Sequence, residues 1–288
     1  MSIDVTIKQK GFLKKPLPLE IILGKELAYG AFADDSLVRG QLGESDFIAY
    51  HPQHIGRGFS VVWTQDEKKR VDLRLPQPST PLETADFYHT VERIATYWSA
   101  ELTVDGNKTS LTDFLNGYDD MVDFNCRTVK HFCESVLSGE HDTLTLYSAM
   151  WPLHLGKHEA ARFAEDADAF YNWLHEKQNL DASYCCPQFF RSEQGIEGRF
   201  LFAADQALIF PKKPYIPFGL TDPDTGNALE CTDWKVWIIK NMSEGPVAEI
   251  EFAEFLSRLP AEKTQELDAE LLLISPFSET DTDALLAH

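Results

Sequence analysis

The sequence predicts an α+β fold, with a mixed or antiparallel sheet and three to four helices. Two observations lead to this prediction. Short runs in the first third alternate between apolar and polar residues, as half-buried strands do. Apolar stripes at helical spacing follow later, but they do not alternate regularly with the strands. An irregular order of helices and strands is typical of α+β proteins rather than of parallel βαβ architectures.

The N-terminal part is predicted to consist mainly of strands. Val71, Leu73 and Leu75 alternate with Asp72 and Arg74, which indicates a strand with one buried face. The charged run before it, residues 65–70, is then the exposed turn of a hairpin. Further strands are expected at residues 3–8, 19–23, 47–50 and 59–64.

Three helices are predicted in the middle of the chain. The first begins with Thr80 as its cap, Pro81 at the first helical position and Glu83 completing a capping box. The second covers about residues 119–137 and ends at Gly139, because glycine favours helix C-termini. A hairpin at residues 101–111 separates these two helices. The third helix is expected at residues 158–177.

The remainder of the chain is predicted to return to strands, at residues 143–147, 183–191, 199–203, 206–210 and 233–240. Apolar residues between 248 and 259 fit both strand and helix spacing, so both assignments stay open. The stretch after Pro276 has the composition of a frayed tail. We expect a single compact domain over residues 1–288, or two intimate and similar halves at 1–142 and 143–288.

Charge is distributed unevenly along this acidic chain, whose formal net charge is −20. Residues 1–76 hold 11 basic and 10 acidic side chains, whereas residues 77–142 hold 4 and 12 and the last 43 residues hold 2 and 10. Such an excess repels phosphates and argues against general nucleic-acid binding. It favours a basic protein as partner. Imitation of DNA by the acidic surface is a rarer alternative.

The five cysteines are spread widely, and the N-terminal segment lacks the apolar core of a signal peptide. These features predict reduced thiols and a cytoplasmic protein. The longest apolar runs, such as residues 271–274, are too short to span a bilayer. We therefore expect a soluble protein with no membrane partner.

The most concentrated polar segment is residues 51–59. It contains His51 and His54, followed by Arg57 between Gly56 and Gly58. Glycines allow close approach of a ligand, and a guanidinium with exposed amides can hold a carboxylate or phosphate. These five residues are the candidate ligand-binding site. The alternative interpretation is a tight connection before a strand, with Arg57 paired to a local carboxylate.

No metal site, cofactor or catalytic residue is predicted. His154, His158 and Glu159 resemble a zinc-protease helix, but the glutamate follows the second histidine instead of lying between the two. The acidic run 222–233 resembles a calcium loop, but its glycine is displaced from the turn position. Phosphate-loop, dinucleotide-binding and nucleophile-elbow motifs are missing from the sequence.

The run FIAYHPQHIGRGF at residues 47–59 resembles a stretch of an uncharacterised bacterial family, domain of unknown function 4299. Residues 71–76, 86–88 and 111–115 resemble the same family. The resemblance covers most of the chain. It implies a bacterial source, a cytoplasmic protein and no assigned activity, and it supplies no catalytic residues.

Two functional hypotheses follow. The first is a non-enzymatic binding or regulatory module whose acidic surface takes a basic protein, for example a toxin-neutralising module. The alternative is a small-anion-binding protein or enzyme, in which Arg57 holds the anion and His51 or His54 moves a proton near neutral pH. The oligomeric state cannot be derived from the sequence.

Overall fold

The computed structural model describes residues 1–33, 35–193, 195–241, 243 and 245–287. Helices and strands occur in similar proportion, which confirms the predicted α+β fold. The chain forms two compact units, Met1–Asn179 and Leu180–His288. Residues 143–179 therefore pack with the N-terminal unit, while the expectation of one domain or two similar halves stays a prediction.

The N-terminal unit is built on an eight-stranded antiparallel sheet with the order β3-β2-β4-β5-β6-β1-β7-β8. The predicted strands at residues 3–8, 47–50, 59–64 and 71–75 all belong to it, and β2 and β3 were not predicted. The bounds are β1 Ser2–Lys8, β2 Ala28–Ala33, β3 Ser36–Arg39, β4 Asp46–Tyr50, β5 Phe59–Val62, β6 Arg70–Pro76, β7 Glu101–Val104 and β8 Asn107–Thr109.

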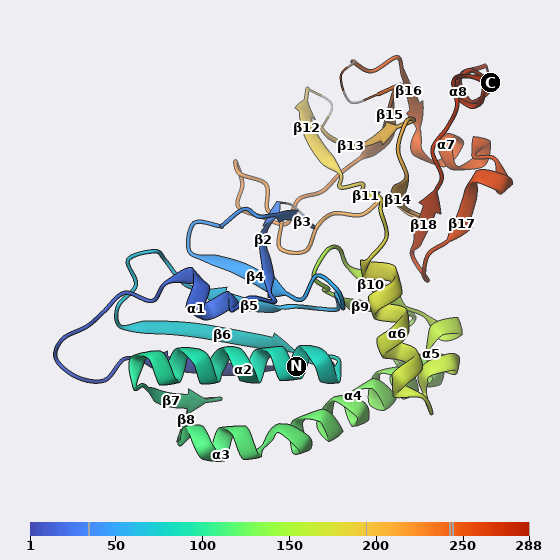
Figure 1. Cartoon of the computed structure of the whole chain (residues 1–288). Coiled ribbons are helices and arrows are strands. Elements are labelled where there is room, and N and C mark those ends of the chain that lie inside the picture. Colours follow the sequence, from blue (N-terminus) through green and yellow to red (C-terminus); the bar gives the residue numbers. More distant parts are fainter. Residues whose placement is uncertain (34, 194, 242, 244, 288) are drawn as a thin grey trace. The chain divides into compact units, whose positions relative to one another are not determined.

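One face of this sheet is covered by α2, Pro81–Trp98 (Figure 1). The predicted capping box is present, because Thr80 and Glu83 satisfy each other's backbone N–H groups. Phe87, Val91 and Ile94 are fully buried against the apolar side of the strands. The opposite face of the sheet carries the polar members of the alternation, so it is the face on which a polar ligand can be held.

Four further helices of this unit follow α2. They are α3, Leu111–Asn116, α4, Tyr118–Ser138, α5, Lys157–Phe163, and α6, Ala167–Gln178. The first two contact α2, and the last two pack against α4. The prediction of α4 is confirmed, including its end at the left-handed Gly139. The predicted helix at residues 158–177 is wrong as a single element, because the first helix ends at Phe163 and a second begins at Ala167. Asp166 then caps α6 by accepting a hydrogen bond from the Ala169 N–H.

The predicted strand at residues 19–23 is wrong, since this segment is the short helix α1, Leu19–Leu23. A run of five residues, of which all but Glu20 are apolar, does not distinguish the two structures by periodicity. Tertiary contacts decide here: Arg93 of α2 donates to the carbonyls of Ile21 and Ile22, and Thr90 also donates to that of Ile22. These donors satisfy carbonyl groups that a short helix leaves unpaired.

The segment after α4 forms a two-stranded sheet from β9, Leu144–Leu146, and β10, Leu153–Leu155. The turn between them carries Tyr147 and Ser148. The Ala149 N–H donates to the Gly56 carbonyl at 3.0 Å, which holds this turn against the connection between β4 and β5.

The C-terminal unit contains two four-stranded sheets, β11-β14-β18-β17 and β12-β13-β15-β16. Its core is aromatic, with Phe200, Phe210 and Phe255 fully buried. The strands are β11 Ser183–Tyr184, β12 Gln188–Ser192, β13 Gly195–Ala203, β14 Leu208–Pro211, β15 Asp233–Ile239, β16 Ala248–Glu251, β17 Thr264–Glu266 and β18 Leu271–Ile274.

Both assignments left open for residues 248–259 occur in succession, because β16 leads directly into α7, Phe252–Arg258. The expected frayed tail is wrong. Residues Glu279–Leu286 form α8, which begins with a capping box between Ser278 and Asp281. Leu285 of α8 is 3% exposed, so burial of this side chain stabilises a segment of polar composition.

Candidate functional site

The segment that connects β4 to β5 is held by a buried carboxylate. Glu83, at the third position of α2, accepts hydrogen bonds from the Gly58 N–H at 2.7 Å and the Thr80 N–H at 3.0 Å. A Cβ atom at Gly56 would overlap the Glu83 carboxylate. The glycine is therefore needed for the close approach of the loop to the helix. Burial raises the pKa of Glu83, against the effect of these donors and of the Arg57 charge.

Gly58 has a φ of +64°, and a Cβ atom there would press on the Ile48 side chain and the Ala49 carbonyl. A residue with a side chain is strained in this left-handed conformation. The conformation turns the chain into β5 and leaves Arg57 directed to the polar side of the sheet.

Arg57 is 9% exposed. Its Nε donates to the Tyr147 carbonyl at 3.0 Å, and its Nη1 donates to the Pro78 carbonyl at 3.4 Å. Within the described part of the chain, Arg57 forms no ion pair and its Nη2 has no hydrogen-bond partner. Burial lowers the pKa of Arg57 to about 10, and the Glu83 charge opposes this shift. The guanidinium is therefore charged at neutral pH, with donors to spare.

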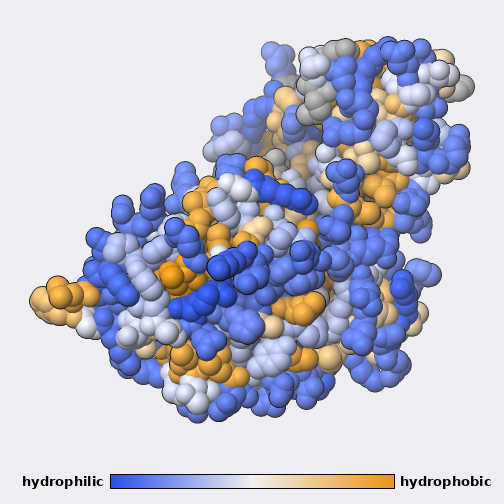
Figure 2. All heavy atoms as spheres, viewed as in Figure 1, coloured by the Kyte–Doolittle hydropathy of each residue, from blue (hydrophilic) through white to orange (hydrophobic). Residues whose placement is uncertain are grey.

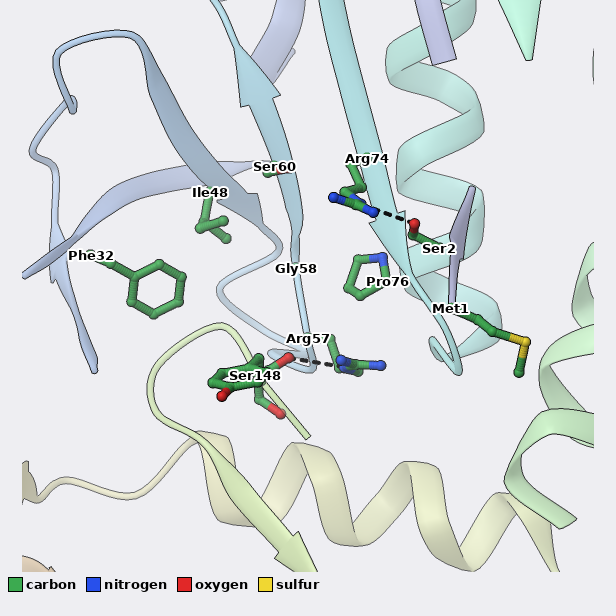
Figure 3. Close-up of a pocket in the computed structure, with 11 residues that line it drawn as sticks. Met1, Ser2, Phe32, Ile48, Arg57, Gly58, Ser60, Arg74, Pro76 and Ser148 are labelled. Atoms are coloured by element: carbon green, nitrogen blue, oxygen red, sulfur yellow. Dashed lines mark hydrogen bonds between the residues drawn. The ribbon is translucent and has the colours of Figure 1, made fainter. Parts of the chain in front are cut away.

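Arg57 lines a pocket of about 430 Å³, hereafter the Arg57 pocket (Figure 3). Arg74 is the second arginine in its lining, and Pro76 is drawn between the two in Figure 3. The walls combine the hydroxyl groups of three serines with several apolar side chains. The lining consists of Met1, Ser2, Phe32, Ile48, Arg57, Gly58, Ser60, Arg74, Pro76, Tyr147 and Ser148.

Strand register brings the polar groups of this pocket together. Arg74 of β6 pairs with Ser60 of β5 on one side and with Asp4 of β1 on the other. Its Nε donates to the Ser2 hydroxyl at 2.9 Å and lies 3.2 Å from an Asp4 carboxylate oxygen. The Arg74 side chain is 62% exposed, so this ion pair is weak and can yield to a ligand.

The two candidate histidines lie apart from this lining. His51 and His54 stack on each other, with ring centroids 3.5 Å apart and an angle of 16° between the planes. Burial lowers the pKa of His54, and the charges of His51 and His175 lower it further. Of the five predicted residues, the structure thus places Arg57 and Gly58 at the pocket, Gly56 under Glu83, and the histidines elsewhere. Whether these residues bind a ligand stays a prediction.

Sequence reasoning missed Arg74, Ser60 and Tyr147. It also missed that Glu83, besides completing the capping box, accepts a hydrogen bond from the Gly58 N–H. The alternation in residues 71–75 placed Arg74 on the polar face, but the sequence holds no signal for its pairing with Ser60. Tyr147 follows Arg57 by 90 positions, and only tertiary structure brings its carbonyl to the guanidinium.

A family model described as a domain of unknown function (DUF4299) matches residues 2–285. The chain belongs to this family. The match confirms the resemblance found in the sequence and extends it over almost the whole chain. No curated protein and no solved structure matches the chain.

The residues that the structure describes hold no group of three or more histidine, cysteine, aspartate or glutamate residues placed to bind a metal ion. None of their helices combines the length and the apolar composition that crossing a bilayer requires.

Proposed function

We propose that the protein binds a small organic anion, a carboxylate or a phosphate, in the Arg57 pocket. One observation carries the proposal: a buried, charged guanidinium lines the pocket, and part of its donor set is not engaged by the described residues. A buried charge without an ion pair is costly, the Glu83 charge offsets this cost only in part, and an anionic ligand would compensate it further. The planar guanidinium suits the bidentate geometry of carboxylates and phosphates.

The remaining lining supports an organic body on the anion. Arg74 and the hydroxyl group of Ser60 offer further donors beside the guanidinium, whereas the Ser148 hydroxyl donates to the Leu146 carbonyl. Phe32 and Ile48 provide an apolar wall on the same pocket, and Phe32 is 46% exposed, so it can pack on a ligand. The proposal concerns binding, because the histidines that could move a proton are not part of the lining.

Titration calorimetry with acetate, benzoate, inorganic phosphate and phenyl phosphate tests this function. We expect at least one of these anions to bind, and benzoate or phenyl phosphate to bind more tightly than acetate or inorganic phosphate. Arg57→Gln and Arg74→Gln should each weaken binding by about tenfold or more, since a hydrogen bond to a charged group contributes about 1.5–3 kcal/mol.

Arg70→Gln is the matched control. Arg70 lies on the same strand and face, pairs with Asp72 at 2.8 Å and does not line the pocket. Because Arg74 is exposed, its substitution preserves the fold even if that of Arg57 does not. Absence of binding by all four anions, or equal binding by the wild type and both pocket variants, would show the proposal to be wrong.

A second function, binding of a basic protein, is supported by α4. Asp119, Asp120 and Asp123 are exposed near its start, and no ion pair to them is found among the residues that the structure describes. Unpaired carboxylates of one sign speed association with a basic partner. Capture of a partner that is lost at moderate salt, and lost in the Asp119→Asn, Asp120→Asn, Asp123→Asn triple variant, would support this function. Capture unaffected by either change would contradict it.

We also propose that the protein is cytoplasmic and of bacterial origin. The five cysteines carry free thiols, which is consistent with a reducing cytoplasm. The bacterial origin rests on the family resemblance alone.

A further inference from the structure

The loop between β1 and α1 exposes two adjacent large apolar side chains. Phe12 is 100% exposed and Leu13 is 92% exposed. Figure 1 shows this loop extending away from the sheet, and Figure 2 shows hydrophobic atoms gathered at its tip. Single exposed apolar residues are common on protein surfaces, but two neighbours that contact little of their own fold are exposed at a cost.

The base of this loop is fixed by the side chain of Gln9, which is 6% exposed. Its amide donates to the carbonyls of Lys15 and Lys68 and accepts a hydrogen bond from the Lys15 N–H. The indole of Trp98 also donates to the Lys15 carbonyl, at 3.1 Å. A buried polar side chain thus closes the loop, and only residues 10–14 project from the closed base. The hydrogen bonds at the base therefore fix the position of the loop that carries the exposed apolar tip.

Lysines flank the tip in the sequence, and two of them are engaged near its base: the Lys14 ammonium donates to the Gln9 carbonyl, and the Lys15 ammonium lies 3.5 Å from the centroid of the Tyr97 ring. Lys8, Lys10, Lys14 and Lys15 are all exposed, and the sequence holds no acidic residue between Asp4 and Glu20. The hairpin turn before β6 adds two exposed lysines, at positions 68 and 69. This turn lies beside the loop, because the Gln9 N–H and the Gln9 side chain donate hydrogen bonds to its carbonyl groups. The turn contributes two carboxylates, and that of Glu67 accepts hydrogen bonds from the N–H groups of the residues that follow it. Positive charge therefore dominates around the tip of an otherwise acidic protein.

We propose that this basic-apolar tip docks the protein on the surface of an anionic lipid bilayer. Lysines are attracted to anionic headgroups, and apolar side chains beside them enter the boundary between headgroups and acyl chains. A stable protein partner needs about 800 Å² of matching surface on each side, whereas the apolar part here is a convex tip of two side chains. A deformable bilayer accepts such a tip without a complementary cavity.

This inference is independent of the Arg57 pocket and differs from the sequence-based expectation of no membrane partner. That expectation rested on the lack of a segment long enough to cross the bilayer. Contact with the bilayer surface requires no such segment, so the described helices are compatible with it.

Flotation of the full chain with vesicles tests the proposal. We expect binding to phosphatidylcholine vesicles that contain phosphatidylglycerol, and little binding to phosphatidylcholine alone. Each lysine near the surface contributes a factor of about five in affinity, so binding should fall more than tenfold at high salt. The Phe12→Asn, Leu13→Asn double variant should lose about tenfold or more, because two side chains no longer leave water.

Phe218→Asn is the matched control, since Phe218 is 93% exposed in a loop of the C-terminal unit. All three substituted residues are exposed, so the variants should unfold at the temperature of the wild type. Binding by the control at the wild-type level supports the tip as the contact. The proposal is overturned if the wild type does not float with anionic vesicles at low salt. Equal flotation of the double variant and the wild type would also overturn it. So would a double variant that loses self-association while its binding to vesicles is unchanged.

Discussion

Replacing Glu83 with glutamine tests the role of this buried carboxylate in holding the Arg57 loop. The carboxylate has one oxygen for the Gly58 N–H and the other for the Thr80 N–H. An amide has only one oxygen, so its NH₂ group must face one of these two donors. That backbone N–H then loses its acceptor in a site where Glu83 is 3% exposed.

The expected loss of stability follows from these contacts. A buried donor left unpaired costs about 1–3 kcal/mol. Arg57 loses the opposing charge of Glu83, which adds to the cost. We therefore expect Glu83→Gln to lower the free energy of unfolding by about 2–4 kcal/mol. In a unit of this size, that corresponds to a fall of roughly 5–10 °C in the melting temperature.

Urea denaturation of the two proteins at pH 7, followed by circular dichroism and fluorescence, measures this difference. Asp113→Asn is the matched control in the same unit. Asp113 occupies the same position in α3, where the Ser110 hydroxyl caps the helix, but it is exposed. Its substitution should cost about 0.5 kcal/mol. If Glu83→Gln costs no more than this control, burial does not give Glu83 the role assigned to it.

Three further predictions concern individual residues of the fold. Gly58→Ala should lower the free energy of unfolding, measured in urea, by about 2–4 kcal/mol, and Gly139→Ala by about 1 kcal/mol. Both glycines have a positive φ, but only Gly58 lacks space for a Cβ atom. Equal losses in the two variants would contradict this. Burial lowers the pKa of His154 to about 4, so the unfolded chain binds more protons between pH 6.5 and 4, and stability should fall as the pH drops through that window. His154→Gln should flatten this dependence by up to about 3 kcal/mol, and an unchanged slope would refute it. Burial raises the pKa of both Cys133, to about 11, and Cys185, so iodoacetamide should leave these two thiols unmodified in the native protein at pH 8 and react with them only in urea; mass spectrometry of modified peptides decides this.

Local chemistry made much of the fold predictable. The capping box of Thr80 and Glu83 and the glycine end of α4 depend on residues a few positions apart, so the sequence displays them directly. The predicted strand at residues 19–23 is a helix because of donors from α2, about 70 positions away. The end of α5 at Phe163 and the start of α6 after the Asp166 cap were not predicted. In the sequence this cap is a weak signal compared with the apolar stripe that continues from one helix into the next.

The candidate site was predictable only in part, for a similar reason. Glycines around an arginine drew attention to residues 56–58, and the structure gives each glycine a steric reason. The histidines were grouped with Arg57 because they are near in sequence. In the structure they stack on each other and are not part of the lining of the Arg57 pocket. Arg74 joined the site through strand register, which a single sequence does not specify.

The basic groups of both proposals come from the first 76 residues, the part of the chain without an acidic excess. Arg57 and Arg74 line the pocket, and the lysines of the tip and its neighbouring turn lie on the same unit. A protein with a net charge of −20 repels anions at long range, but at physiological salt this repulsion decays over about 8 Å. Within that distance the local cations decide. The uneven charge of the sequence is therefore what allows an acidic protein to hold an anion or to contact an anionic surface. Moderate salt should affect the two differently: it should weaken attachment of the exposed tip strongly, whereas the pocket ligand, bound to a buried guanidinium, is screened less.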